Sequence, residues 1–530
     1  MFPSNSLNLD VSSTIKIFPE SRREQPVSVP LSVIDNTTAD FARCAAVWYF
    51  DPPSGLEHAL SSSHLQASLS KTLDYYRPWC GRLKYAAPKL DGKHTKRYQR
   101  IWVTYNSQND IGIQFITAQS PRKLSEFIPS SSDRTASMKA WDASNVPSEQ
   151  LFPTTKLSIS AEPDAPNVII QFTTFACGSA AIAIEITHCL SDAVCLAQFA
   201  KNWSLMSRSM LSNSPIPTLS PIFDPQLLDS FAAGDIDASS PDAEIQRKAR
   251  ELPQHRFDWY KQTANQPWPL DVPSDFDPKW ELSPSDPIPW EQWDTKAPVS
   301  QRVFHFSAKE IQNIYNLATN APAPGSKKTS KHDALLAHIW SRINVSRQLA
   351  QGTKTYLDMT FGLRARVNPP LPDSFLGSPI THAAIQFPST TPSSTTSPAL
   401  GEVATTIRET LAKFRSKEIA ELLHDNAFEV APQRLWRCCL GREHLLLTTW
   451  VHSGVHEVDF GGVELRYVEA VMPACDGLVV VIESPNVGEE NRKYDGKKSW
   501  IDNGVDVTIF LESEAMERLL NDPALWGNFQ

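Results

Sequence analysis

The segment from residue 253 to residue 298 constrains the fold of this chain more than any other stretch. It holds nine prolines and five tryptophans. Proline fixes φ and removes a backbone donor, so this density excludes a regular helix or a central strand. Disordered segments are poor in aromatic residues, so the tryptophans argue against a flexible spacer. We predict a long surface crossover, and a division of the chain into residues 1–212, 213–300 and 301–530.

The regions on both sides of this segment alternate between helix-like and strand-like patterns. Before it, apolar spacing predicts a helix over about residues 57–76, two strands at 168–176 and 180–187, and a helix that ends near residue 209. Residues 388–400 are rich in Ser, Thr and Pro and predict an exposed loop. After residue 303 the pattern predicts helices at 308–318 and 332–343, and strands near 356–363, 383–386, 445–450, 463–471 and 477–483.

Composition and charge exclude several classes of protein. The 530 residues carry a net charge of −9, and the isoelectric point is about 5.8. No basic stripe offsets phosphate charge, so we expect no nucleic-acid partner. No run of 18 apolar residues predicts a membrane span, and the N-terminus lacks the apolar core of a secretory signal. The eight cysteines show no zinc spacing, which favours reduced thiols in a cytoplasmic protein.

The motif with the most chemical content is HCLSD at residues 188–192. A predicted strand ends at His188, and Asp192 opens a predicted helix, where capping and the helix dipole favour aspartate. An imidazole at a strand end can face a cleft, and its pKa near neutrality suits removal of a hydroxyl proton. The pentapeptide alone also fits a core histidine followed by a helix-capping aspartate, since about one HxxxD arises by chance in such a chain.

Six elements in a fixed order resemble the BAHD acyltransferases, in particular their fungal branch, over nearly the full chain. A chance HxxxD does not explain this order and spacing. The elements are LSVID at 31–35, LSKTL to GRL between 69 and 83, HCLSD at 188–192, SKHDALLAHIW at 330–340, RARVNPPLPDSFLG at 364–377, and TTW at 448–450 with DFG at 459–461. The chain departs from the family pattern at Ala193, where HxxxDG has glycine, and at Gly462 and Val463, where DFGWG has tryptophan and glycine.

The resemblance implies an α/β fold of two similar domains, each a mixed β-sheet flanked by helices as in chloramphenicol acetyltransferase, with a channel between them. An acyl-CoA and a small-molecule alcohol would meet in this channel at His188, the general base of a ternary complex. No acyl-enzyme is needed, which fits the absence of an evident activated Ser or Cys nucleophile. We expect a monomer with no permanently bound cofactor, and acyl-CoA, preferably acetyl-CoA, as co-substrate.

The resemblance also assigns roles around the base. Asp192 is structural in the family: it points away from the imidazole and pairs with an arginine. Arg366 is our first choice for that partner and Arg364 the second. Thr448 and Trp450 are expected to stabilise the oxyanion, with the indole N–H as donor. Trp450 fits a purely apolar core position equally well.

Further residues are expected to bind the co-substrate or to hold the fold. Asp459 and Gly461 belong to a loop that is structural in the family and lies away from the base. The locally basic run before the predicted helix at 332–343 suits the phosphates of CoA, because a helix start and lysines both attract anions. A solvated lysine loop fits this run equally well. The predicted CoA-binding residues are Lys327, Lys328, Ser330 and Lys331.

No metal site is predicted, because His452 and His456 stand four residues apart without a further ligand cluster.

Two other functions remain open from the sequence. A condensation-like enzyme that forms amides or esters typically shows HHxxxDG, and Thr187 occupies the place of its first histidine. A non-catalytic binding protein of the same fold would explain the change at Gly462 and Val463, but the intact His188 argues against it. The expected function is therefore acyl transfer to a hydroxyl group, or less favourably an amine, of a small-molecule secondary metabolite. The sequence does not identify that acceptor.

Overall fold

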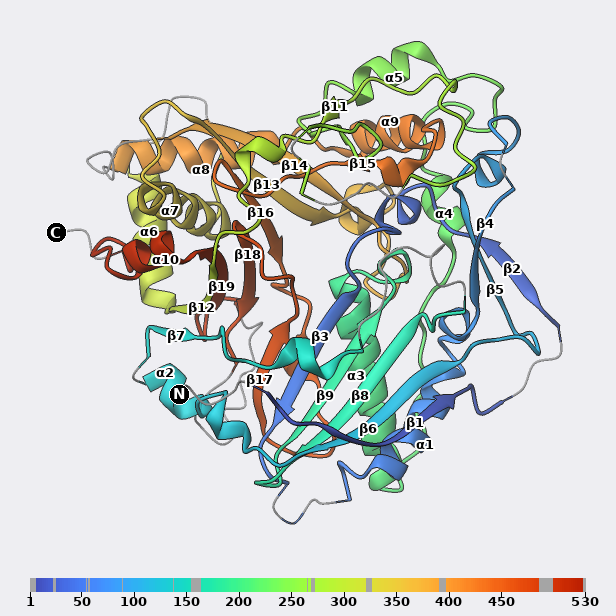
Figure 1. Ribbon diagram of the computed structural model, residues 1–530, viewed down its shortest axis with the longest axis vertical. Helices are drawn as coiled ribbons and strands as arrows, with labels where there is room; N and C mark the ends of the chain where they lie inside the picture. The colour runs from blue at the N-terminus through green and yellow to red at the C-terminus, as the bar shows by residue number, and fades with distance from the viewer. Residues whose placement is uncertain are drawn as a thin grey trace.

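Two mixed β-sheets organise the chain (Figure 1). The computed structural model describes residues 6–21, 25–53, 55, 58–87, 89–136, 138–153, 164–264, 266–267, 272–320, 327–389, 397–485 and 499–527. Helices cover both sheets, so the predicted α/β fold class is confirmed.

The first sheet has six strands in the order β1-β6-β8-β9-β3-β17. Strand β6 pairs with β8 in parallel, and the other neighbours are antiparallel. Helices α1 (Ser62–Leu73) and α3 (Ala193–Leu211) pack against it through an apolar cluster that includes Leu65, Trp203 and Trp48. The strands are β1 (Asp10–Ile17), β3 (Cys44–Phe50), β6 (Ile113–Ser120), β8 (Val168–Phe175), β9 (Ala180–Ile186) and β17 (Leu465–Ala470).

The second sheet has seven strands in the order β14-β13-β16-β18-β19-β12-β7. The pairs β13–β16 and β16–β18 are parallel, and the others are antiparallel. Its strands are β7 (Ala140–Asp142), β12 (Val299–Phe306), β13 (Lys354–Gly362), β14 (Ile380–Pro388), β16 (His444–Thr449), β18 (Leu478–Glu483) and β19 (Val505–Glu512). The helices packed on it are α6 (Ala308–Thr319), α7 (Lys331–Ser346), α8 (Ser397–Leu411) and α10 (Ser513–Leu520).

The two halves of the molecule exchange one strand each. Strand β7 lies in the N-terminal part of the sequence but extends the seven-stranded sheet by pairing with β12. Strand β17 lies in the C-terminal part but extends the six-stranded sheet by pairing with β3. The predicted boundaries at residues 212 and 301 therefore do not follow sheet membership, because strand pairing joins segments across them.

The Pro/Trp-rich crossover packs on the surface of the seven-stranded half. Trp290 and Trp293 are buried in a small apolar cluster with Phe510 of β19, and Trp259 packs against it. Trp268 lies outside the described residues. The elements of the crossover and its neighbours are α4 (Pro225–Asp229), α5 (Ala243–Ala249), α9 (Ser416–Ala427), and a three-stranded sheet of β10 (Phe257–Asp258), β11 (Asp286–Pro287) and β15 (Leu435–Trp436).

Most predicted elements are present, with shifts at their ends. The helix predicted over 57–76 is shorter, because Ser61 is extended and α1 begins at Ser62. The loop predicted at 388–400 contains the start of α8 at Ser397, and residues 390–396 lie outside the described part. The remaining elements are α2 (Ser131–Ala136) and a second three-stranded sheet of β2 (Val27–Pro30), β4 (Arg82–Tyr85) and β5 (Ile101–Tyr105).

Within the described ranges, no helix combines the length and apolar character needed to cross a bilayer. All eight cysteines are described, and each is a free thiol.

The crossover is anchored by a fully buried arginine. Arg434 forms an ion pair with Asp258 of β10 and a second one, at 3.1 Å, with Glu429. Both Arg434 and Asp258 have side chains with 0% exposure. Removing one partner of a buried pair leaves a charge that water cannot reach.

We expect Asp258→Ala to lower the free energy of unfolding by about 3–5 kcal/mol, because it leaves the buried Arg434 charge without this partner. Thermal melts of the purified variant measure this loss. Arg247→Ala is the matched control, since Arg247 pairs with Glu244 on the solvent face of α5 with 56% of its side chain exposed. Its melting temperature should equal that of the wild type. Equal melting temperatures for all three proteins would contradict the anchoring role.

Candidate active site

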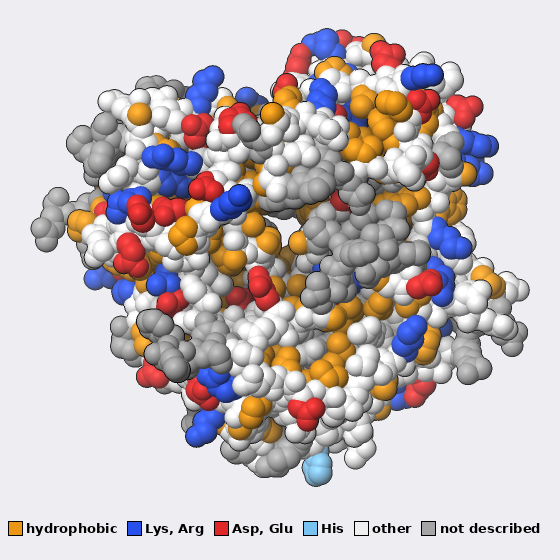
Figure 2. Space-filling model, in the orientation of Figure 1, with side chains coloured by type: hydrophobic (Ala, Val, Ile, Leu, Met, Phe, Trp, Pro, Cys, Tyr) orange, Lys and Arg blue, Asp and Glu red, His pale blue; other side chains and the backbone are white. Residues whose placement is uncertain are grey.

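His188 lies in the short turn between β9 and α3. Strand β9 ends at Ile186, a 3-10 turn spans His188–Leu190, and α3 begins at Ala193. The strand, turn and helix predicted around this histidine are therefore present. The imidazole is partly exposed, and its Nδ1 lies 3.1 Å from the hydroxyl of Ser378. Figure 2 shows that this face of the molecule is hollowed near its centre, between the two halves.

The surroundings of His188 favour a neutral imidazole. Burial lowers its pKa from the ordinary value of 6.5, and the histidine's own backbone and the charge of Asp192 offset this only in part. When Nδ1–H donates to Ser378, the lone pair of Nε2 remains available to accept a proton. A neutral imidazole with one nitrogen held is the form that a general base requires.

Asp192 caps α3 and forms a buried ion pair. Its Oδ1 accepts a hydrogen bond from the backbone N–H of Cys195 at 3.0 Å. Arg364 donates to Oδ2 at 2.5 Å and to Oδ1 at 3.1 Å. The side chains of Asp192 and Arg364 are 5% and 7% exposed, so the pair is shielded from water. The carboxylate is thus committed to the helix and to Arg364.

The prediction of Arg366 as the first-choice partner is wrong, and the second choice, Arg364, is the observed one. Both arginines lie in the 3-10 turn Arg364–Arg366. Such a turn has about three residues per revolution, so positions i and i+2 face different directions. Arg366 donates instead to the carbonyls of Leu411 and Phe414, at 3.0 and 2.9 Å, and lies over the ring of Phe361.

Residues 374–378 lie between the catalytic turn and the N-terminal segment. The backbone N–H of Asp192 donates to the carbonyl of Gly377 at 3.1 Å. The N–H of Ser378 donates to Oδ1 of Asp35 at 2.6 Å. Gly377 has φ of 130°, and a Cβ there would come within 2.9 Å of that carboxylate oxygen. Glycine is therefore required for the close approach.

Asp35 supports the contact between Ser378 and His188. It is fully buried, and burial raises its pKa to about 7 despite hydrogen bonds from Ser32 and Ser378. Asp35 holds the backbone of Ser378, whose hydroxyl in turn contacts His188. In the sequence Asp35 appeared only as the end of an opening motif, and no motif marked Ser378. A contact between residues 343 positions apart leaves no local signal.

Two further rings border the base. Phe41 presents its edge to His188 with ring centroids 5.5 Å apart, and its ring lies 6.1 Å from that of His382 on β14. Burial lowers the pKa of His382 to about 4, so this second imidazole is neutral near pH 7. The sequence patterns singled out neither residue.

The predicted oxyanion residues lie at the end of β16. Thr448 is on the strand itself and pairs with Val480 of β18. Trp450 follows the strand and is buried in the same apolar cluster as Cys189 and Leu190, the neighbours of the base. Donation from the indole N–H to an oxyanion stays a prediction.

Asp459 and Gly461 lie at the far end of α3. Asp459 pairs with Arg208 of α3 at 2.7 Å and accepts a hydrogen bond from the N–H of Gly462 at 2.6 Å. Gly461 and Gly462 have φ of 93° and 83°, the left-handed region that favours glycine. The glycine at position 462 thus suits the observed loop, which contacts the helix that carries Asp192.

The residues predicted to bind CoA precede α7. Lys327 and Lys328 are exposed, and Lys331 is partly exposed. Ser330 is the N-cap of α7: its hydroxyl accepts from the N–H of Asp333 at 3.1 Å and also bonds Arg408 at 2.8 Å. The hydroxyl is thus already used within the fold, whereas the three lysines are placed at a helix start.

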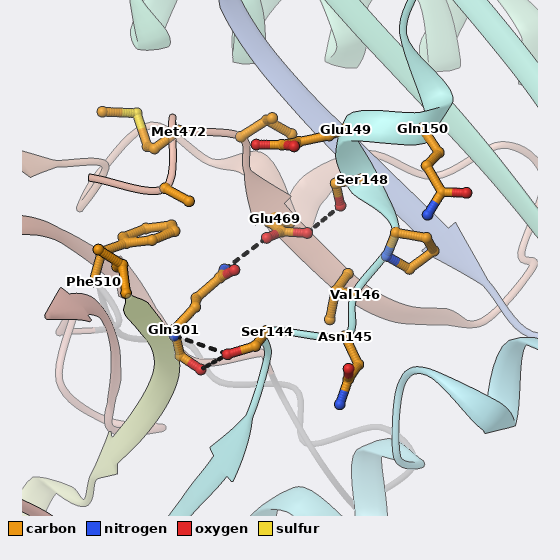
Figure 3. Close-up of a pocket in the computed structure, with 14 residues that line it drawn as sticks. Ser144, Asn145, Val146, Ser148, Glu149, Gln150, Gln301, Glu469, Met472 and Phe510 are labelled. Carbon is orange, nitrogen blue, oxygen red and sulfur yellow. Dashed lines mark hydrogen bonds between the residues drawn. The ribbon is translucent and has the colours of Figure 1, made fainter. Parts of the chain in front are cut away.

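A separate pocket of about 220 Å³ lies where the halves exchange strands. Figure 3 shows the carboxyl of Glu469 on β17 between Ser148 and Gln301. Burial raises the pKa of Glu469 to about 7, although both partners lower it. His188 and Ser378 are not among the lining residues, so this pocket is distinct from the catalytic turn.

Comparison with known proteins adds to this geometry. A model of the Transferase family matches residues 7–525. Acyltransferase AFT15-1 from Alternaria alternata is 24% identical over 98% of this chain and 97% of its own length. Acyltransferase abl6 from Leptosphaeria maculans is 25% identical over 98% of each chain. The solved structure of F. graminearum TRI101 complexed with coenzyme A and deoxynivalenol has a TM-score of 0.64 at 13% identity, and covers 95% of this chain and 99% of that one.

We expect Asp192 and Arg364 to be energetically coupled. Asp192→Asn and Arg364→Gln should each lower the melting temperature, since breaking a buried pair typically costs about 3–5 kcal/mol. The double variant should lose much less than the sum of the two losses.

A cycle of Asp192→Asn with Arg366→Gln is the control, because Arg366 bonds to carbonyls and not to Asp192. Its two losses should add. Additive losses for the Asp192/Arg364 pair would show that the two residues do not act together.

Proposed function

The chain belongs to the BAHD acyltransferase family, and from this premise we propose that it transfers an acyl group from acyl-CoA to a hydroxyl of a small molecule, with His188 as general base. The observation that carries the proposal is the set of contacts at the turn that holds His188. Nδ1 of His188 is held by Ser378 while Asp192 is turned away and paired with Arg364. This leaves Nε2 for the substrate and gives the carboxylate a structural task.

The chemistry proceeds within a ternary complex. Nε2 of His188 takes the proton of the acceptor hydroxyl as the oxygen attacks the thioester carbonyl. The tetrahedral oxyanion is stabilised by donors near the end of β16, for which Trp450 Nε1 and Thr448 Oγ1 are our candidates. The oxyanion collapses, the C–S bond breaks, and the imidazolium returns its proton to the CoA thiolate.

A covalent route through a neighbouring thiol is disfavoured. Cys189 and Cys195 are fully buried on either side of the turn residues Leu190–Asp192. Burial raises the pKa of Cys195 to about 12, helped by the charge of Asp192, and it raises the pKa of Cys189 as well. A thiol that stays protonated is a poor nucleophile, which supports direct transfer.

The substrates are proposed from the chemistry of the residues and from the relatives. The structure of TRI101 that resembles this chain is complexed with coenzyme A and deoxynivalenol. We propose acetyl-CoA as the donor and a hydroxylated secondary metabolite as the acceptor, for a monomeric cytoplasmic enzyme. Lys327, Lys328 and Lys331 would contact the phosphates of CoA at the start of α7.

We expect His188→Ala to lower kcat/KM by about 10²–10⁴ without a change in melting temperature, as loss of a general base does. The assay follows thiol release from acetyl-CoA with a panel of alcohols and amines. His58→Ala is the matched control, because His58 is exposed. Wild-type turnover by the His188 variant would refute the mechanism.

The pH dependence of the activity should reflect the lowered pKa of His188. The imidazole acts in its neutral form, and burial lowers its pKa below 6.5. Activity is then retained as the pH falls to 6.5 and is lost only below the lowered pKa. The acid limb of a kcat/KM profile should give an apparent pKa under 6.5. A value at or above 7 would contradict the proposed environment of His188.

A further inference from the structure

Three side chains of metal-binding type meet in the seven-stranded half, and none of them belongs to the turn His188–Leu190. His255 comes from the crossover, Asp358 from β13 and His444 from β16. One ligand atom from each residue lies within 4.8 Å of the other two. His255 Nε2 is 3.0 Å from Asp358 Oδ1, and His444 Nδ1 is 2.9 Å from Asp358 Oδ2. The side chains of Asp358 and His444 are 0% and 2% exposed.

Hydrogen bonding leaves two atoms of this cluster unsatisfied. Among the described residues, His255 Nε2 and Asp358 Oδ1 are buried atoms with no hydrogen-bond partner. The two atoms lie 3.0 Å apart, but their geometry does not meet the angles of a hydrogen bond. Buried polar atoms without partners are costly, and such pairs need an explanation. A cation that both His255 Nε2 and Asp358 Oδ1 bind through a lone pair would explain the pair.

We propose that His255, Asp358 and His444 bind one divalent transition-metal ion, with Zn²⁺ as the best fit. Imidazole and carboxylate are ligands that zinc accepts, and donors about 2.0–2.1 Å from a tetrahedral zinc lie roughly 3.3 Å from one another. The 3.0 Å between His255 Nε2 and Asp358 Oδ1 is close to that value, and His444, which hydrogen-bonds Asp358 Oδ2 at 2.9 Å, brings a third ligand atom within 4.8 Å.

The surroundings hold these ligands in place. The N–H of Cys439 donates to Asp358 Oδ2 at 2.9 Å. The ring of Tyr356 stacks on His444 at 4.7 Å, and the ring of Phe257 stacks on His255 at 4.7 Å.

The role of the ion follows from the elements it joins. Strands β13 and β16 are parallel neighbours within the sheet, while His255 belongs to the crossover. The ion therefore fastens the crossover to the sheet next to Arg256, which pairs with Asp425 and Glu429. We assign it a structural role, because His255 is not part of the catalytic turn. The sequence analysis expected no metal, since residues this far apart show no ligand spacing.

The test is metal analysis of the full-length protein after exposure to Zn²⁺ and removal of loosely bound ions. We expect one zinc per chain in the wild type and a loss of at least tenfold in His255→Gln. Co²⁺ in place of Zn²⁺ should give the visible absorption of a tetrahedral site in the wild type only. A chelator should lower the melting temperature of the wild type and leave that of His255→Gln unchanged.

His305→Gln is the matched control, because His305 pairs with Asp506 at 2.8 Å outside the three-residue cluster. It should keep the full metal content. A wild type that retains no zinc overturns the proposal, whatever the behaviour of the variants. So does zinc retained equally by His255→Gln, since the ion would then lie elsewhere.

Discussion

The buried ion pair between Asp192 and Arg364 is the interaction on which the rest of the site depends. A buried pair contributes little net stability, because desolvation offsets most of its Coulomb energy. Its effect here is to fix the positions of Asp192 and Arg364 relative to each other. Asp192 also accepts from the N–H of Cys195, and Arg364 also donates to the carbonyl of Phe375. Through Arg364 the pair ties Asp192, in the turn after β9, to the carbonyl of Phe375 in the segment 374–378.

This segment also contacts His188 through the hydroxyl of Ser378. The carbonyl of Gly377 accepts a hydrogen bond from the N–H of Asp192, and the N–H of Ser378 donates to the carboxyl of Asp35. Phe375 forms a parallel β-bridge with Ile222 of the crossover. These contacts position the segment whose Ser378 hydroxyl lies 3.1 Å from Nδ1 of His188. A small displacement of either half would move the hydroxyl away from Nδ1, and rates fall steeply with such displacements.

The sequence predicted local features well and distant contacts poorly. The strands on both sides of Cys177, the turn at His188 and helix α3 follow from hydrophobic period and capping, which act within a few residues. The partner of Asp192 was misassigned because a motif with two arginines does not show which one faces inward. The exchange of β7 and β17, and the support of His188 by Asp35, depend on pairing between residues hundreds of positions apart. No periodicity encodes such pairing.

Buried carboxyl groups join the two halves in two ways: two have a raised pKa, and a third forms an ion pair. Burial raises the pKa of Asp35 and of Glu469 to about 7, and each accepts a hydrogen bond from the opposite half, from Ser378 and Gln301 respectively. A carboxyl with a pKa near 7 is protonated part of the time at neutral pH, which avoids part of the cost of burying a charge. The full ion pair between Asp192 and Arg364 stands beside the turn that carries His188. Positional accuracy matters most there, and the directional, two-pronged bond of a guanidinium supplies it.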